Sequence, residues 1–500
     1  MNTRTPVIFP FLLFPFLLVA DEFVSYEDFG AVGDGVHDDL PAIVQAHNYA
    51  NTHGLLVRTR PDATYHLGGR DLTATITTDT DWNTSRFTID DRDVENNKQV
   101  LFEVVSRLPS TTLPIESLRR DQERLVLDLD QDYWVEVTSD RVMRFIRLGP
   151  NQNNGMPQRD CFILRQDGSI ESPIDWNYDH ISEVRAKPID KTTLTIKGGV
   201  FTTIANNMVQ AKGYNYWERN IRITRSNTVI IGLTHYVFGE TSVGHPYRGF
   251  LSIEDCANVT LRDCFVSGHK YFETIGSAGV PVPMGTYDLN ANSVVNLSLI
   301  RVRMNHILDE TRWGVTGTNF CKNILLEDCE LSRMDAHMGV SGTYIIRGTT
   351  LGWMGLNAIG RGLLLIEDST IHGRSLISFR HDYGATWEGD VEIRNSRWLP
   401  PDRGERALVL FDGRNDGQHD FGYPCFMPRN IKIDGLYIDD SLRRGPLYFF
   451  QGPGSLDPSK TPFPFILTEK VEVKNLSTAS GERPEISSNS YLVDSIVLID

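Results

Sequence analysis

Between residues 269 and 383 the chain brings together arginine, lysine, histidine and carboxylate side chains of the kinds that bind and break charged sugars. Arginine neutralises carboxylates, histidine transfers protons near neutral pH, and carboxylates act as acids, bases or nucleophiles. The residues that we predict to be catalytic are His337, Asp335, Arg312, Asp309, Glu310, Arg380 and His381. Those that we predict to bind substrate are Lys270, His306, Arg333, Trp353, Asn357, Arg374, Asp382 and Tyr383.

β-Elimination is the first reaction that these residues predict. Cleaving a uronate chain in this way needs a cation that neutralises the sugar carboxylate, so that the C5 proton becomes acidic, and a base that removes this proton. The candidate bases are His337 and His306. The candidate cations are Arg312, Arg333, Lys270 and Arg380.

Hydrolysis of a glycosidic bond is the second reaction, and it needs two carboxyl groups about 5 to 9.5 Å apart. Asp335 with Asp309 or Glu310 would form such a pair on adjacent coils, because stacked strands lie about 4.8 Å apart. The spacing leaves both reactions open, and the abundance of arginine and histidine slightly favours elimination. The same three carboxylates are the candidates for a calcium site, since this ion prefers oxygen ligands.

The charge of the chain limits the class of partner. The formal net charge is -16, which argues against nonspecific binding to nucleic acid. Residues 301–380 nevertheless hold nine Lys or Arg against eight Asp or Glu, a local balance that suits an acidic polysaccharide or oligosaccharide. A noncatalytic carbohydrate-binding or adhesive protein is the alternative from another class, and the oligomeric state stays open.

A repeated phrase must position these side chains. Residues 256–266 read C-A-N-V-T-L-R-D-C-F-V and residues 321–331 read C-K-N-I-L-L-E-D-C-E-L. Apolar residues two apart followed by a corner are typical of a short β-strand. Intervals of 20 to 40 residues between copies indicate stacked coils with loop insertions, so the phrase predicts a parallel β-helix. Its first apolar residue recurs at Leu194, Ile221, Val259, Leu297, Ile324, Tyr344, Leu364, Val391, Ile431 and Val471.

Two residue types recur at fixed places in the phrase. An asparagine precedes the apolar residue at Asn220, Asn258, Asn296, Asn323 and Asn430, where we expect a left-handed bend and amides that hydrogen-bond from coil to coil. Cysteines occupy equivalent positions in the two copies quoted above, and we interpret them as small buried residues of the core.

The N-terminal part adds a resemblance. Residues 26–46 read Y-E-D-F-G-A-V-G-D-G-V-H-D-D-L-P-A-I-V-Q-A, in which glycines permit tight turns and Ala42, Ile43 and Ala46 form an apolar helical stripe. The segment closely resembles the opening motif of the pectate-lyase-like (pectin lyase fold) superfamily. The resemblance implies a right-handed parallel β-helix with a capping helix over its first coil. It implies no single reaction, because the superfamily includes lyases, hydrolases, epimerases and phage tailspikes.

Composition and pattern divide the chain into four parts. Residues 1–20 combine Arg4, an apolar run and Ala20 in the pattern of a signal peptide. Residues 21–90 are predicted to hold the N-terminal cap and first coils, residues 91–185 an inserted β-rich subdomain or irregular coils, and residues 186–500 the parallel β-helix with long loop insertions. We therefore expect an all-β protein that is secreted or periplasmic, without membrane association after signal removal.

Overall fold

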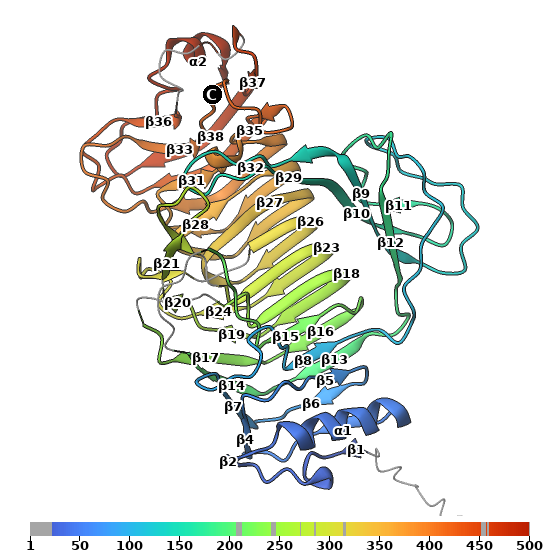
Figure 1. Cartoon of the computed structure of the whole chain (residues 1–500). Coiled ribbons are helices and arrows are strands. Elements are labelled where there is room, and N and C mark those ends of the chain that lie inside the picture. The colour runs from blue at the N-terminus through green and yellow to red at the C-terminus, as the bar shows by residue number, and fades with distance from the viewer. Residues whose placement is uncertain are drawn as a thin grey trace, which may run out of the picture.

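The computed structural model describes residues 23–206, 213–241, 247–270, 272–284, 287–313, 317–451, 457 and 460–499. The predicted signal peptide lies outside these residues. Parallel strands stack along the length of the molecule, from helix α1 (Leu40–His53) near one end to the C-terminal coils at the other (Figure 1). No helix in the described ranges is both long and apolar enough to span a membrane.

Three faces of paired strands wind around one apolar core. The first face consists of β1 (Phe23–Val24), β3 (Leu56–Arg58), β6 (Thr80–Asp81), β13 (Leu194–Lys197), β16 (Thr228–Ile231), β29 (Gly360–Glu367), β32 (Trp387–Trp398), β35 (Asn430–Ile438), β38 (Lys470–Thr478) and β39 (Val497–Ile499), together with parts of the long strands β18 (Leu251–Arg262), β23 (Leu289–Ile300), β26 (Gly317–Glu327) and β27 (Glu330–Arg347).

The second and third faces complete each coil. The second consists of β5 (Ala74–Ile76), β8 (Phe102–Val104), β15 (Ile221–Ile223), β28 (Thr350–Asn357), β31 (Ser375–Ser378), β33 (Leu408–Asp412) and β36 (Leu447–Phe450), with the first residues of β18, β23 and β26 and the middle of β27. The third consists of β2 (Asp34–Asp38), β4 (Thr64–Leu67), β7 (Arg86–Asp90), β14 (Val200–Ile204), β17 (Thr234–Phe238), β19 (Phe265–Val266), β24 (Arg303–Met304) and β30 (Thr370–Ile371), with the first residues of β27 and β28 and the last of β32.

The predicted apolar row is confirmed, with one correction. Nine of the ten predicted residues align from coil to coil on the first face, but Ile221 does not. Ile221 pairs with Leu251 on the second face, and Thr228 takes the expected place between Leu194 and Val259. The error arises because Ile221–Ile223 has the same apolar alternation as the true strand of that coil.

Asparagines form the expected ladder beside this row at three of the five predicted positions. Asn220 and Asn430 are not part of it, because their side chains donate to the carbonyl of Gly249 and to Asp390 instead. The Nδ2 of Asn258, Asn296 and Asn323 each donates to the amide oxygen of the previous asparagine, at 2.8 to 2.9 Å, and the ladder starts at Asn227. All four residues have positive φ between 53° and 62°, where asparagine is tolerated better than most residues. The ladder therefore fixes the backbone bend that directly precedes the apolar row in each of these coils. The cysteines are buried and unpaired, as expected of core residues.

Helix α1 covers the first coils, as the resemblance implies. Its buried face includes Ile43, Ala46 and His47, and His47 Nε2 lies 2.9 Å from the hydroxyl of Tyr26. Trp82 of the coil below donates to the same hydroxyl at 2.8 Å, so the cap is held by polar contacts as well as by apolar packing.

An antiparallel sheet projects from the side of the β-helix. It consists of β9 (Tyr133–Arg144), β10 (Met156–Leu164), β11 (Ile170–Glu171) and β12 (Glu183–Pro188), and it has its own apolar core (Figure 1). Lys322 of the β-helix, with a side chain 2% exposed, lies 2.8 Å from Asp160 and 3.4 Å from Asp175 of this inserted part. These buried ion pairs fix the sheet in place, and with it the loop 145–155 between β9 and β10.

The asparagine ladder generates a stability prediction. Replacing Asn323 with Ala removes its amide hydrogen bonds. It also puts alanine at φ 56°, a left-handed conformation that alanine adopts less readily than asparagine. We therefore expect the free energy of unfolding to fall by about 2 kcal/mol. Asn323→Gly removes the same hydrogen bonds without the backbone strain and is expected to cost about 1 kcal/mol less. Chemical denaturation measures both values, and equal losses in the two variants would contradict the strain argument.

Candidate active site

A cleft of about 850 Å³ opens on the second face of the β-helix. Its floor follows one row of paired residues, in which Asp335 of β27 aligns with Asn357 of β28 and then with Ser378 of β31. Because the strands are parallel and in register, side chains from three coils meet along this row. The one-turn helix η2 (His381–Tyr383) follows β31 and brings three more polar side chains to the same place.

Loops from distant parts of the chain form the walls. The loop 145–155 of the inserted sheet contributes Arg147 and Asn151, and Tyr214 lies beside it with its hydroxyl donating to Asn151. The hairpin of β21 (Phe272–Ile275) and β22 (Pro281–Met284) contributes another wall, and Tyr287 follows it. Polar groups on the floor and aromatic rings on the walls are common in sites that bind sugars or other small molecules.

Asp335 is the centre of the charged network on the floor. It is 1% exposed, Arg333 Nη2 lies 2.7 Å from its Oδ2, and Arg380 Nη1 donates to Oδ1 at 3.0 Å. Asn357 Nδ2 also donates to Oδ1, at 3.1 Å. Burial alone would raise the pKa of Asp335, but the two guanidinium groups hold it well below its usual value. Asp335 is therefore a fixed anion that orients two arginines.

Asp382 forms a second, linked pair. Its carboxylate accepts from Arg380 Nε and Nη2 at 3.0 and 2.8 Å, and Arg147 Nη2 lies 2.7 Å away. Burial opposes ionisation, yet these two arginines lower the pKa of Asp382 well below its usual value. Arg380, whose backbone has φ 54°, thus bridges Asp335 and Asp382.

His337 and Tyr383 are two neighbouring groups in the cleft that can pass a proton between them. The hydroxyl of Tyr383 lies 3.1 Å from His337 Nε2, while Nδ1 lies 3.2 Å from Arg380 Nη1 and 3.7 Å from Asp335 Oδ2. Burial and the positive charge of Arg380 lower the pKa of His337, so the ring is neutral at neutral pH. Burial raises the pKa of Tyr383, which keeps the phenol protonated.

The cleft gathers many of the predicted residues and excludes others. The side chains from the predicted set that line it are His337, Asp335, Arg380, His381, Arg333, Asn357, Asp382 and Tyr383. Those that do not line it are Arg312, Asp309, Glu310, Lys270, His306, Trp353 and Arg374. These seven residues lie on loops or strands outside the cleft, so the structure does not bring them together with the other eight.

Their own contacts explain where several of them lie. Arg312, on β25 (Arg312–Trp313), pairs with β20 (His269–Lys270) and donates to the carbonyl of Gly268 at 2.9 Å. Arg374 stacks on Trp353 at 5.3 Å. Asp309 accepts from the backbone and the hydroxyl of Thr311. Within the described residues Asp309, Glu310 and Asp335 do not form a group of ligands, so the structure does not bring these three carboxylates together as the calcium hypothesis requires.

Sequence reasoning missed the residues on the walls. Arg147, Tyr287, Tyr214 and Asn151 all line the cleft but were not predicted. Arg147 lies in the part of the chain where the repeated phrase is lost, and Tyr287 lies at the end of a hairpin insertion. The one available signal was the polar composition of the loop 145–155, which carries an arginine and several asparagines between two β-type runs.

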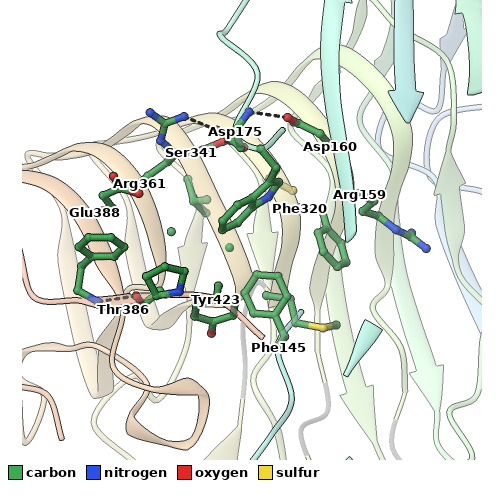
Figure 2. Close-up of a pocket in the computed structure, with 18 residues that line it drawn as sticks. Phe145, Arg159, Asp160, Asp175, Phe320, Ser341, Arg361, Thr386, Glu388 and Tyr423 are labelled. Carbon is green, nitrogen blue, oxygen red and sulfur yellow. Dashed lines mark hydrogen bonds and ion pairs between the residues drawn. The ribbon is translucent and has the colours of Figure 1, made fainter. Parts of the chain in front are cut away.

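A second, smaller pocket lies next to the cleft and shares Met338 with it. Figure 2 shows Phe145, Phe320 and Tyr423 among the residues that line this pocket, and Arg361 beside Asp175, 3.5 Å apart. Its volume is about 50 Å³, and it lies where the inserted sheet meets the β-helix. It is too small for a polymer, so the large cleft is the candidate active site.

Comparisons with known proteins agree with this architecture. The tailspike gp61 of Pseudomonas phage phi297 superposes with a TM-score of 0.53 over 92% of this chain and 80% of its own, at 12% sequence identity. The tailspike gp49 of Pseudomonas phage LKA1 gives 0.52 over 95% and 84%, at 14% identity. The chain has the parallel β-helix fold of these tailspikes. The resemblance to the pectin lyase fold is thereby confirmed for the architecture of this β-helix.

Sequence comparison gives a more limited result. No family model matches the chain. A depolymerase of Klebsiella phage P510, described as specific for capsule KL64, is 31% identical over 121 residues. The match covers 22% of this β-helix protein and 12% of the depolymerase, so the chain aligns with a small part of that relative.

The network around Asp335 predicts how stability depends on pH. Because the folded state lowers the pKa values of Asp335 and Asp382, their contribution to stability is present above the ordinary carboxyl pKa of about 4 and is lost as pH falls toward the folded values. Asp335→Asn removes the anion between two buried guanidinium groups and is expected to cost about 3 kcal/mol at pH 7.

Unfolding in urea at several pH values measures this effect. The expected result is that stability falls less steeply below pH 4 in Asp335→Asn than in the unmodified protein. The control is Glu310→Gln, because Glu310 is exposed and its replacement should change stability by less than about 0.5 kcal/mol. Identical slopes in Asp335→Asn and in the unmodified protein would show that Asp335 is not the anion described here.

Proposed function

We propose that the protein is a polysaccharide lyase that cleaves an acidic polysaccharide by β-elimination. The observation that carries this proposal is the neutral His337, in contact with the Tyr383 hydroxyl at 3.1 Å, in a cleft that also contains Arg147, Arg333 and Arg380. Elimination needs a proton acceptor next to cations that neutralise a uronate carboxylate, and this cleft supplies both.

Hydrolysis by paired carboxylates is the weaker proposal. It requires one carboxyl group that is protonated, so that it can protonate the leaving oxygen. Asp335 and Asp382 are the two carboxylates on the floor of the cleft, and arginines lower the pKa of both. Neither is suited to act as an acid at neutral pH, and Asp309 and Glu310 do not line the cleft.

In the proposed reaction the uronate carboxylate binds at the arginines, which stabilise the negative charge that forms when C5 loses its proton. Tyr383 Oη takes the C5 proton as its own proton passes to His337 Nε2, and the bond from C4 to the glycosidic oxygen breaks to leave a C4–C5 double bond. The imidazolium then returns its proton through the Tyr383 hydroxyl to the departing oxygen, which leaves as a hydroxyl group. The step needs an unprotonated Nε2 and so a proton on Nδ1, which in this structure faces the donor Arg380 Nη1 at 3.2 Å. The proposal therefore has Arg380 turn from Nδ1 to the substrate carboxylate, so that Nδ1 donates to Asp335, whose charge stabilises the imidazolium that forms.

The comparisons support a substrate outside the cell. Two solved structures with the same fold are phage tailspikes, and a curated relative of part of the chain is a capsule depolymerase. We propose that this chain likewise acts on a surface or extracellular polysaccharide, as a secreted or periplasmic protein. The residues 1–20, with the pattern of a signal peptide, are consistent with this location.

Turnover of uronate-containing polysaccharides tests the proposal. We expect the unmodified protein to produce ends with the ultraviolet absorbance of an unsaturated uronate, and His337→Asn and Tyr383→Phe to reduce kcat by about 10²- to 10⁴-fold. Because the pKa of His337 is lowered, kcat/KM should fall on the acid side with an apparent pKa below 6.5. His306→Asn is the matched control, since His306 does not line the cleft and should keep full activity.

The same assay separates the alternatives. New reducing ends without absorbance would mean hydrolysis and would contradict elimination. Binding of a polysaccharide with neither signal, unchanged in His337→Asn, would instead favour the noncatalytic binding protein. Loss of activity in His306→Asn but not in His337→Asn would show that the cleft is not the active site.

A further inference from the structure

A buried cluster of metal-ligating side chains lies next to the cleft, since Asp288 directly follows the lining residue Tyr287, and the proposed reaction does not use it. It consists of His235 on β17, His269 on β20, and Asp288, which directly precedes β23. The three side chains are at most 1% exposed. It is the single group of this kind among the residues that the structure describes.

In each histidine one ring nitrogen, here called proximal, faces the carboxylate of Asp288, and the other is called distal. His235 Nδ1 lies 3.3 Å from Asp288 Oδ1, and His269 Nε2 lies 3.0 Å from the same oxygen. Despite this distance, His269 Nε2 makes no aligned hydrogen bond with any described residue, and neither does Asp288 Oδ2. Buried polar atoms are almost always paired, so the unpaired Asp288 Oδ2 and the poorly aligned His269 Nε2 indicate that this site lacks a partner.

The distal nitrogens are already held by oxygen atoms. His269 Nδ1 lies 2.6 Å from Glu240 Oε1, and His235 Nε2 lies 3.0 Å from Thr203 Oγ1. If these nitrogens carry the ring protons, both proximal nitrogens present lone pairs to the space beside Asp288. A histidine whose far nitrogen donates to a carboxylate or hydroxyl while its near nitrogen faces a shared centre is the usual arrangement around a protein-bound metal.

The rings have little freedom to turn away. His235 stacks on Phe250 with ring centroids 3.7 Å apart and an angle of 5° between the planes. His269 stacks on Tyr247 at 5.5 Å. Glu240 is fixed in turn, because its second oxygen accepts from the backbone nitrogen of Lys270 at 2.9 Å. The ligand atoms are therefore pre-oriented by packing rather than by one another.

We propose that His235, His269 and Asp288 bind one zinc ion. Two imidazole nitrogens and a carboxylate oxygen suit zinc better than calcium, which prefers a shell of six or more oxygens. Zinc bonds of about 2.0 to 2.2 Å place neighbouring ligand atoms roughly 3.3 Å apart, close to the distances that these atoms already have. Zinc would also give Asp288 Oδ2 and His269 Nε2 a positive neighbour.

The ion would hold the base of one wall of the cleft. His269 and Asp288 flank residues 270–287, which include the hairpin of β21 and β22 and end at Tyr287. A metal that joins these two residues to His235 on the neighbouring coil closes this insertion at its base. The inference does not depend on the reaction proposed for the cleft, since metal content is measured without a substrate.

A protonated His269 between two carboxylates is the competing explanation. Burial opposes the charge, but Asp288 and Glu240 raise the pKa of His269 to about 10 when no metal is present. The same negative surroundings would therefore attract either a proton or a metal ion. Metal analysis of the protein separates the two.

The experiment uses the full chain, treated with a chelator and then loaded separately with Zn²⁺, Co²⁺ or Ca²⁺. We expect close to one zinc per chain after gel filtration, a Tm several degrees above that of the chelated protein, and visible absorption of Co²⁺ in a four-coordinate site. Ca²⁺ should leave the Tm unchanged. His269→Gln should lose the zinc, and Glu240→Gln, which keeps all three ligands, should bind it about 10- to 100-fold more weakly.

His372→Gln is the control, because His372 lies on another coil and should keep one zinc per chain. If the unmodified protein holds no stoichiometric zinc and its Tm does not respond to zinc, His269 is a buried imidazolium and the proposal is wrong. Equal zinc content in His269→Gln and the unmodified protein would also overturn it. Should His269→Gln fail to fold, the zinc content, Tm response and Co²⁺ spectrum of the unmodified protein still decide.

Discussion

Parallel hydrogen bonding between each coil and the next is the constraint on which the rest of this molecule depends. It forces residues of equal register into rows, whether they are apolar, as in the row from Leu194 to Val471, or polar, as in the row of Asp335, Asn357 and Ser378. A row carries a function only where loops leave it open to solvent. The site therefore arises from a regular scaffold interrupted at a few coils.

Charge compensation decides what the open row can do. Asp335 and Asp382 are anions because arginines surround them, and Arg380 is shared between the two. Such a network is costly to break, since each removal leaves a buried charge. Its consequence is chemical as well as structural: the carboxylates are unavailable as acids, while burial and the positive charge of Arg380 lower the pKa of the adjacent His337 and keep its ring neutral.

The sequence predicted the scaffold better than the site. Alternation and corner residues locate strands, so the row of core residues could be found, and it failed at Ile221 because a neighbouring strand has the same alternation. Asp335, His337 and Arg380 could be found because they lie on or directly after coil strands. Arg312 could not be placed correctly, because counting from the strand assumes equal coils and an insertion moves it onto β25.

Residues from insertions are beyond such reasoning. Arg147 reaches the cleft from a hairpin loop of the inserted sheet, and its position depends on buried ion pairs such as that of Lys322 with Asp160. No local pattern links these segments. The cluster of His235, His269 and Asp288 is similar, because it joins three insertions or strand ends that are close only after the coils have stacked.

Cleavage of a polysaccharide in water labelled with oxygen-18, followed by mass spectrometry of the products, tests the central claim most directly. Elimination adds no water, so the account predicts unlabelled products in which the piece that gains the new non-reducing end is unsaturated. Incorporation of one labelled oxygen atom at each cleavage would show that a water molecule attacks the bond, and would contradict the roles assigned to His337, Tyr383 and the arginines.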